Sequence, residues 1–169
     1  KFVAACDLAD PGLGVPGPKL IADNKDGFYK ANMGLFYGRY LTQRRLFDEA
    51  LEVFAGLDAG DVVDPAGYLY FKAVCEHQLL QRTDGLATIR RLLENTSDVP
   101  LRYTTVAKLM QHDLQQLKKD SLAEISRKMR DVERRLELGR GGQRVQKEED
   151  EIVAALDVII EKLEQQGGT

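Results

Sequence analysis

The fold is decided by residues 64–100, which read DPAGYLYFKAVCEHQLLQRTDGLATIRRLLENTSDVP. This stretch repeats the residues before it at a spacing of 35. The positions that match across this spacing are small, apolar or proline: Gly38 and Ala73, Ala50 and Gly85, Phe54 and Ile89, Leu57 and Leu92, Pro65 and Pro100. Small and apolar positions that recur at a period of 20 to 50 residues mark a stacked array of helices. We therefore expect an all-α fold.

The composition is that of a soluble helical protein, with 43% hydrophobic and 30% charged residues in a chain of 169. A net charge of −3 gives no global electrostatic reason to expect nucleic acid as a partner. No apolar run approaches the roughly 18 residues that a membrane-spanning helix needs. The length suits one domain, or one domain with an appendage.

The sequence divides into three parts. Residues 1–25 form a tail in which prolines alternate with glycines, a composition that disfavours helix. Residues 26–118 predict five helices, at about 27–43, 47–57, from Asp64-Pro65, from Thr83 or Asp84 to about 95, and from Asp98-Pro100 to about 117. The third is apolar nearly all round, so we expect it to be central and the most buried. Residues 119–169 predict an antiparallel helical hairpin.

Residues 31–99 resemble the tetratricopeptide repeat (TPR), a 34-residue helical pair. The positions that carry the resemblance are Gly38, Leu41, Phe47, Ala50 and Phe54 in the first unit and Leu69, Ala73, Gly85 and Ile89 in the second. The sequence departs from the family pattern at the tryptophan position, which holds Gly34 or Leu69, and at the closing proline, which is Val62 or Ser97.

The TPR resemblance implies two helix pairs, closed by the fifth helix as a cap. It also implies a concave face, which in that family grips extended peptides. The candidate binding residues on that face are Asn32, Arg39, Gln43, Tyr70 and His77.

The hairpin is predicted by two apolar patterns on either side of Gly139-Arg140-Gly141-Gly142. Ser121 and Glu124 form a capping box at the start of its first helix. One antiparallel register pairs four apolar layers: Leu136 with Val145, Met129 with Ile152, Ile125 with Leu156, and Leu122 with Ile159. In that register Val132 faces Glu149, which is a poor layer. Residues 127–147 carry eight basic and three acidic groups, whereas residues 148–164 carry one basic and seven acidic groups, so the arms attract each other.

The hairpin also resembles a C-terminal segment of helical-repeat proteins of planctomycete bacteria that have no assigned activity. The matching residues include Arg102-Tyr103, Asp120-Ser121-Leu122, Arg134-Arg135-Leu136 and Leu138-Gly139-Arg140. This resemblance favours the bacterial cell envelope or periplasm as the location, with the cytoplasm as the other reading. Val3-Ala4-Ala5-Cys6 resembles a lipoprotein cleavage box, and a chain that begins at Lys1 suggests a processed or excised piece.

The sequence offers little material for catalysis, so we expect no enzyme, no metal site and no cofactor. Cys75 and His77 point to different sides of a helix, and zinc needs about four converging ligands. Cys6 and Cys75 are expected to be free thiols. The carboxylates of residues 148–151 spread around a helix end, and the glycines of residues 139–142 follow a helix and lack the lysine of a phosphate loop.

The sequence therefore predicts a non-enzymatic protein–protein interaction or scaffold module with a protein or peptide partner. The basic stretch 127–144 is not expected to bind nucleic acid because acids are interleaved with it and face it. The alternative is a ligand-binding or enzymatic domain that uses a polar pocket near Arg39 and His77. Val153 and Ile160 form a second apolar stripe, which either packs on the fifth helix or makes a homodimer through the hairpin.

Overall fold

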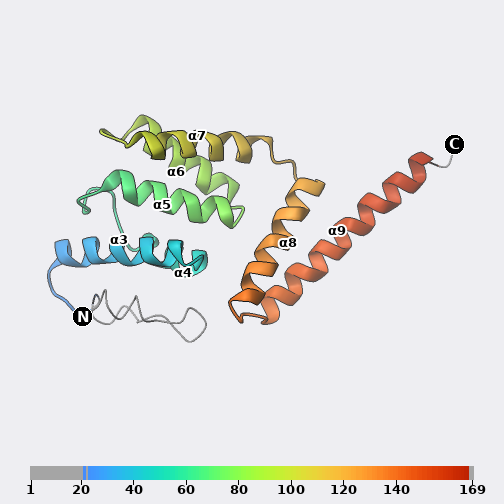
Figure 1. Ribbon diagram of the computed structural model, residues 1–169, viewed down its shortest axis with the longest axis horizontal. Helices are drawn as coiled ribbons and strands as arrows, with labels where there is room; N and C mark the ends of the chain where they lie inside the picture. Colours follow the sequence, from blue (N-terminus) through green and yellow to red (C-terminus); the bar gives the residue numbers. More distant parts are fainter. Residues whose placement is uncertain (1–20, 22, 168–169) are drawn as a thin grey trace. The chain divides into compact units, whose positions relative to one another are not determined.

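The protein is described by a computed structural model that covers residues 21 and 23–167 (Figure 1). These residues form seven α-helices and no strand, which confirms the all-α expectation. The helices are α3 (Gly27–Gln43), α4 (Phe47–Ala55), α5 (Pro65–Gln78), α6 (Arg82–Glu94), α7 (Leu101–Gln116), α8 (Leu122–Glu137) and α9 (Gln143–Gly167). Most of the expected Pro/Gly-rich tail, with Cys6 and the cleavage-box motif, lies outside the described residues.

The chain divides into two compact units, the first ending at Gln115 and the second beginning at Gln116. The sequence placed its boundary between residues 118 and 119, in the turn after α7. The first unit contains α3 to α7, and the second contains the α8–α9 hairpin.

The ends of the helices follow local chemistry, with one correction. The Asp26 carboxylate accepts hydrogen bonds from the backbone N–H groups of residues 28 and 29, and that of Asp64 accepts one from residue 67, so both aspartates cap a helix. Pro65 then occupies the first turn of α5. The expectation that Thr83 or Asp84 caps the next helix is wrong, because α6 already begins at Arg82 and Gln81 makes no side-chain cap.

The reason for the early start of α6 is the turn that precedes it. Leu80 adopts a left-handed conformation (φ 57°), and the N–H of Gln81 returns to the carbonyl of Glu76. The same turn ends α3, where Arg45 has φ 62° and the N–H of Leu46 returns to the carbonyl of Leu41. Both are Schellman motifs, which reverse the chain at once and allow the next helix to begin within two residues. The two turns lie 35 residues apart.

The first unit is built around α5, which contacts α3, α4 and α6. Figure 1 shows α5 between α3 and α7, as expected for the central helix. Small residues allow these helices to approach closely: Ala50 and Ala73 are 0% exposed, and a Cβ added at Gly38 would lie 2.3 Å from the Phe54 ring. Phe54, Leu41, Ile89 and Leu92 fill the remaining space and are almost fully buried.

The hairpin begins and turns as the sequence predicts. Ser121 Oγ accepts a hydrogen bond from the N–H of Glu124, and the Glu124 carboxylate accepts one from the N–H of Asp120. Gly139 supplies the positive φ (71°) that ends α8 in another Schellman turn, in which the N–H of Arg140 donates to the carbonyl of Arg135.

The four apolar layers expected in the hairpin are only partly correct. Its buried core consists of Ile125, Val132, Val145 and Ile152, with Ala155, Leu156 and Ile159 partly buried against it. The α8 residues of the other three layers are at least half exposed: Leu122 (62%), Met129 (51%) and Leu136 (50%). The physical reason is the rotation of α8 about its axis: it turns the line of Ile125 and Val132 towards α9, so the line of Leu122, Met129 and Leu136 lies outside the contact. Val132, expected to face a charge, is instead in the core.

Ion pairs join the two arms of the hairpin, with the cations on α8 and the acids on α9, as expected from the charges of the arms. Lys128 Nζ lies 3.8 Å from the carboxylate of Glu151, and Arg135 Nε lies 3.7 Å from that of Glu148. Arg135 also donates a hydrogen bond to Asp131 at 2.6 Å, and this arginine is only 5% exposed. Basic groups on α8 are therefore engaged by acids of both helices.

Candidate functional site

The residues predicted to bind a peptide come from two neighbouring helices of the first unit. Asn32, Arg39 and Gln43 lie on α3, and Tyr70 and His77 lie on α5, which contacts α3. Gln43 is exposed, whereas the other four are half-buried and engaged in contacts within the unit.

The Asn32 side chain connects the loop between α4 and α5 to α3 through hydrogen bonds. Its side-chain carbonyl accepts a hydrogen bond from the N–H of Val63 at 2.8 Å, and its amide donates to the carbonyl of Phe28 at 2.8 Å. Both ends of the amide are used, so this side chain has a structural task in addition to any contact with a partner.

Aromatic and cationic side chains form a continuous row across α3, α5 and α7. The Arg39 guanidinium lies 5.0 Å from the centre of the Phe71 ring, which meets Tyr70 edge-on. Tyr70 stacks on Tyr103 with 4.0 Å between ring centres, and Arg102 covers the Tyr103 ring. Burial, together with the neighbouring Tyr103 hydroxyl, raises the pKa of Tyr70 above its usual value. Stacked rings and cations of this kind hold α3, α5 and α7 together.

His77 is paired with Asp113 of α7, which the sequence analysis did not single out. The Nε2 atom lies 2.6 Å from the carboxylate, and the histidine side chain is 14% exposed. Its second ring nitrogen, Nδ1, is buried and has no hydrogen-bond partner within the described residues. A catalytic base needs a nitrogen within hydrogen-bond reach of a substrate proton, and in this arrangement neither ring nitrogen faces solvent freely.

Two further groups of α5 are inaccessible to a substrate. Cys75 is a fully buried thiol that is not part of a disulfide, as expected, and its sulfur lies 3.2 Å from the Thr42 hydroxyl. Glu76 is 3% exposed, and burial raises the pKa of its carboxyl above the usual range, while a hydrogen bond from Thr88 acts in the opposite direction. Among the described residues, no group of three or more His, Cys, Asp and Glu side chains has metal-binding geometry.

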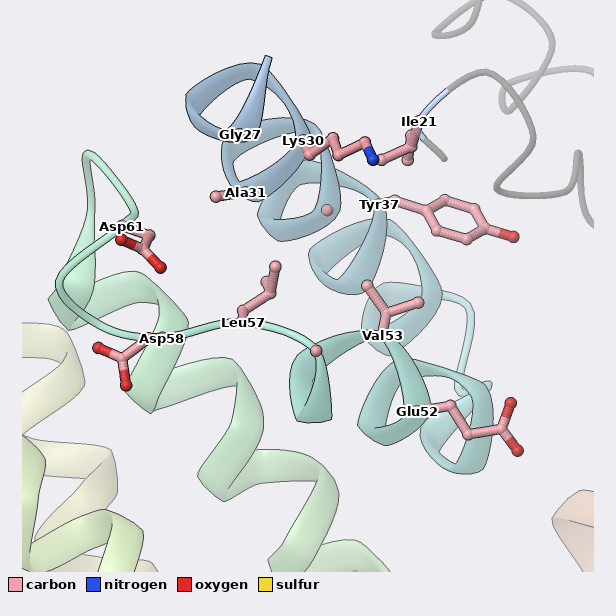
Figure 2. A pocket seen from close by; sticks show the side chains of 12 residues that line it. Ile21, Gly27, Lys30, Ala31, Tyr37, Glu52, Val53, Leu57, Asp58 and Asp61 are labelled. Carbon is pink, nitrogen blue, oxygen red and sulfur yellow. The ribbon is translucent and has the colours of Figure 1, made fainter. Parts of the chain in front are cut away.

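A cavity of about 600 Å³ opens between α3 and α4 (Figure 2). Ala31 and Tyr37 of α3, Val53 of α4 and the adjoining Leu57 line its apolar part. Asp58 and Asp61, on the loop after α4, lie at one end in Figure 2, and Lys30 lies near Ile21 at the other. None of the five predicted binding residues lines this cavity.

A second hollow, of about 500 Å³, lies on the hairpin between α8 and α9. Val132 and Ile152 are buried at its base, and the exposed side chains of Met129, Leu136 and Val153 form its apolar walls. Its remaining lining residues, Glu133, Glu137 and Glu149, are exposed acids. We call this hollow the hairpin groove.

The exposed stripe on α9 was predicted from the sequence, whereas the α8 side of the groove was not. Val153 and Ile160 are 57% and 52% exposed, as expected for a stripe that the hairpin does not cover. No signal in the sequence marks the α8 side, because the apolar residues of α8 follow one heptad stripe and both lines of such a stripe normally face the same partner helix.

Comparison with protein-family models, with curated proteins and with solved structures finds no match for this chain. Within the described part of the chain, no helix is long and apolar enough to cross a membrane, in agreement with the expectation from sequence.

Proposed function

We propose that the protein is a non-enzymatic interaction or scaffold module that binds a protein partner through the hairpin. The observation that carries this proposal is the apolar surface that the hairpin leaves uncovered. Met129, Leu136, Val153 and Ile160 are each at least half exposed, and the first three share one groove. Gathered apolar side chains around a hollow are typical of interaction sites, whereas single exposed apolar residues are ordinary.

In this proposal the first unit is a TPR-like array of two helix pairs capped by α7, which acts as a rigid support. The identical turns after α3 and α5, 35 residues apart, support it, as do the buried small residues Ala50 and Ala73. The concave face of Asn32, Arg39, Gln43, Tyr70 and His77 becomes a secondary contact surface. Internal contacts already engage most of it, which is why we assign the main binding role to the hairpin.

We propose a protein rather than a nucleic acid as the partner. Phosphate binding depends on cationic side chains that neutralise the backbone. Several cations of the hairpin are already neutralised by its own acids: Lys128 by Glu151, Arg135 by Asp131 and Glu148, and Arg144 by Glu148. Retention on heparin that depends strongly on salt would contradict this part of the proposal.

Affinity capture from native extract, with the full chain as bait, tests the proposal. We expect at least one protein that is retained by the parent and lost by a Met129→Glu, Val153→Glu variant, because charges in the groove walls oppose apolar docking. A matched variant, Leu101→Glu with Val63→Glu, places the same charges on exposed apolar residues of the first unit and should keep that protein. Capture that is equal for all three baits would refute the hairpin as the binding surface.

The alternative, a ligand-binding or enzymatic domain near Arg39 and His77, draws support from the short contact between His77 and Asp113. This alternative is the weaker candidate because Nδ1 of His77 and the Cys75 thiol are both buried. A broad hydrolase and transferase screen of the parent and of His77→Ala tests it. We expect no activity in either protein, and an activity that His77→Ala abolishes would replace the scaffold proposal.

A further inference from the structure

The hairpin groove combines an apolar interior with a rim of one charge sign. The interior comes from Met129 and Leu136 on α8 and from Ile152 and Val153 on α9. The charged residues that line it are Glu133, Glu137 and Glu149, and no cation of the described residues lines it. For Glu133 and Glu137 this is a local reversal, because residues 127–147 as a whole carry a net charge of +5.

The rim carboxylates and the nearby cations have different partners. Within the described residues, Glu133 and Glu149 make no ion pair. The Arg135 and Arg144 side chains both contact Glu148, and Arg135 also contacts Asp131. The hairpin thus neutralises several of its cations internally, while two rim acids remain exposed at an apolar groove. Such a rim attracts a cationic partner and repels an anionic one.

The shape of the apolar surface indicates the secondary structure of the partner. On α8 the exposed apolar residues Leu122, Met129 and Leu136 follow one another at intervals of seven residues, over about 21 Å of helix. A line with heptad spacing is the pattern that packs against another helix. Here the groove is formed by two helices and offers no sheet edge to an extended chain, so a helical occupant, which satisfies its own backbone hydrogen bonds, suits it best.

A second copy of the hairpin suits this groove less well. If α9 were the occupant, its stripe of Val153 and Ile160 would enter with Glu149, Asp150, Asp157 and Glu164 three or four residues away on the helix surface. Acids on the occupant would then meet the acids of the rim. Like charges placed together across an interface oppose association.

We propose that the hairpin groove binds an amphipathic helix of a partner protein, in which lysines or arginines flank an apolar stripe. The leucine-like residues of the partner helix fill the space between Met129, Leu136 and Val153, and its cations pair with Glu133 and Glu149. This inference rests on the proposed function and adds the chemistry and the conformation of the partner.

The experiment uses the full chain and two synthetic 18-residue peptides labelled with a fluorophore. In both peptides leucines at helical spacing (i, i+3, i+4 and i+7) form one apolar stripe. The positions that flank this stripe are lysines in one peptide and glutamates in the other. Fluorescence anisotropy measures the affinity, and circular dichroism measures peptide helicity on binding. We expect the parent to bind the lysine peptide at least about tenfold more tightly than the glutamate peptide, with an increase in helicity.

Charge-reversal variants separate a specific groove from general attraction to an acidic protein. Glu133→Lys with Glu149→Lys should weaken binding of the lysine peptide about tenfold. The control, Glu52→Lys with Glu94→Lys, changes the net charge equally at exposed acids of the first unit and should change the affinity by no more than about twofold. Equal weakening by both variants, or equal binding of the two peptides, would overturn the inference.

Light scattering distinguishes this inference from the broader proposal. A parent that is dimeric, and that becomes monomeric and still helical in Met129→Glu with Val153→Glu, would assign the groove to a second copy; this refutes the basic partner helix but leaves an interaction module. A monomeric parent that binds neither peptide and captures no groove-dependent protein from extract would refute both. A monomeric parent that binds the lysine peptide through Glu133 and Glu149 supports both.

Discussion

The two units differ in how completely their helices cover one another. In the first unit, five helices bury Phe54, Ala50 and Ala73 to 0% exposure, and backbones approach so closely that Gly38 has no room for a Cβ. In the hairpin, two helices bury one line of apolar side chains and leave Met129, Leu136 and Val153 half exposed. A helix in an array has neighbours on several sides, whereas a helix in a hairpin has one. Apolar side chains beyond that single contact are available to a partner.

The largest effect should come from Gly38→Ala in the first unit. The new Cβ would meet three carbons of the Phe54 ring at 2.3 to 2.9 Å, and this ring is fully buried. We expect a loss of about 3 kcal/mol of stability, at the upper end of overpacking costs. Urea unfolding followed by tyrosine fluorescence measures this in the first unit alone, because all six tyrosines lie between residues 29 and 103.

The control for this prediction is Gly85→Ala, the other small helix-contact position. Its added Cβ meets the end of the flexible Leu114 side chain at 3.0 Å, and alanine is the better helix former by about 1 kcal/mol. We expect a change within about 1 kcal/mol. If Gly38→Ala were as mild as this control, the close packing described for the first unit would be incorrect.

Ala50→Leu should have the next largest effect. Ala50 is 0% exposed on α4, and three extra carbons must displace neighbours in a filled core. We expect a loss of about 2 kcal/mol, measured by the same tyrosine signal. An unchanged unfolding midpoint would show that α4 does not pack as closely as the structure indicates.

A pair of α8 variants tests the hairpin side of the comparison. Val132→Ala removes buried carbons from the core and should cost about 1 to 2 kcal/mol, whereas Met129→Ala removes a half-exposed side chain and should stay within about 0.5 kcal/mol. Far-ultraviolet circular dichroism, which reports on all helices, detects the hairpin transition. If Met129→Ala cost more stability than Val132→Ala, the register expected from the sequence, in which Met129 belongs to the core, would be correct instead.

The smallest effect concerns pH and the buried Glu76 in the first unit. Because burial raises its pKa in the folded state above the reference value of 4.5, the folded protein holds this proton at pH values where the unfolded chain has lost it. Its contribution to stability is therefore fully present below pH 4.5 and is lost as pH rises through the folded pKa. Glu76→Gln should remove this part of the pH dependence. Unfolding midpoints of both proteins from pH 4 to pH 8 provide the measurement, and parallel curves would contradict the assigned cause.

The sequence determined the helices, because their signals are local. Asp26, Asp64 and Ser121 cap helices where hydrogen-bond chemistry places them, and the small residues Ala50 and Ala73 lie at helix contacts. The start of α6 was the exception. There the left-handed Leu80, a conformation uncommon for leucine, outweighed the capping preference of Thr83 and Asp84.

Only the tertiary structure decided which side of each helix is buried against a neighbouring helix. Heptad spacing marks Leu122, Met129 and Leu136 as part of an apolar stripe, but the face that α8 turns towards α9 determines that Val132 is buried and Met129 is not. Long-range pairs show the same limit: His77 meets Asp113 and Tyr70 meets Tyr103 across more than 30 residues, so no local pattern marks them. A sequence specifies which residues each helix carries, whereas the packing of whole helices decides which of them remain exposed.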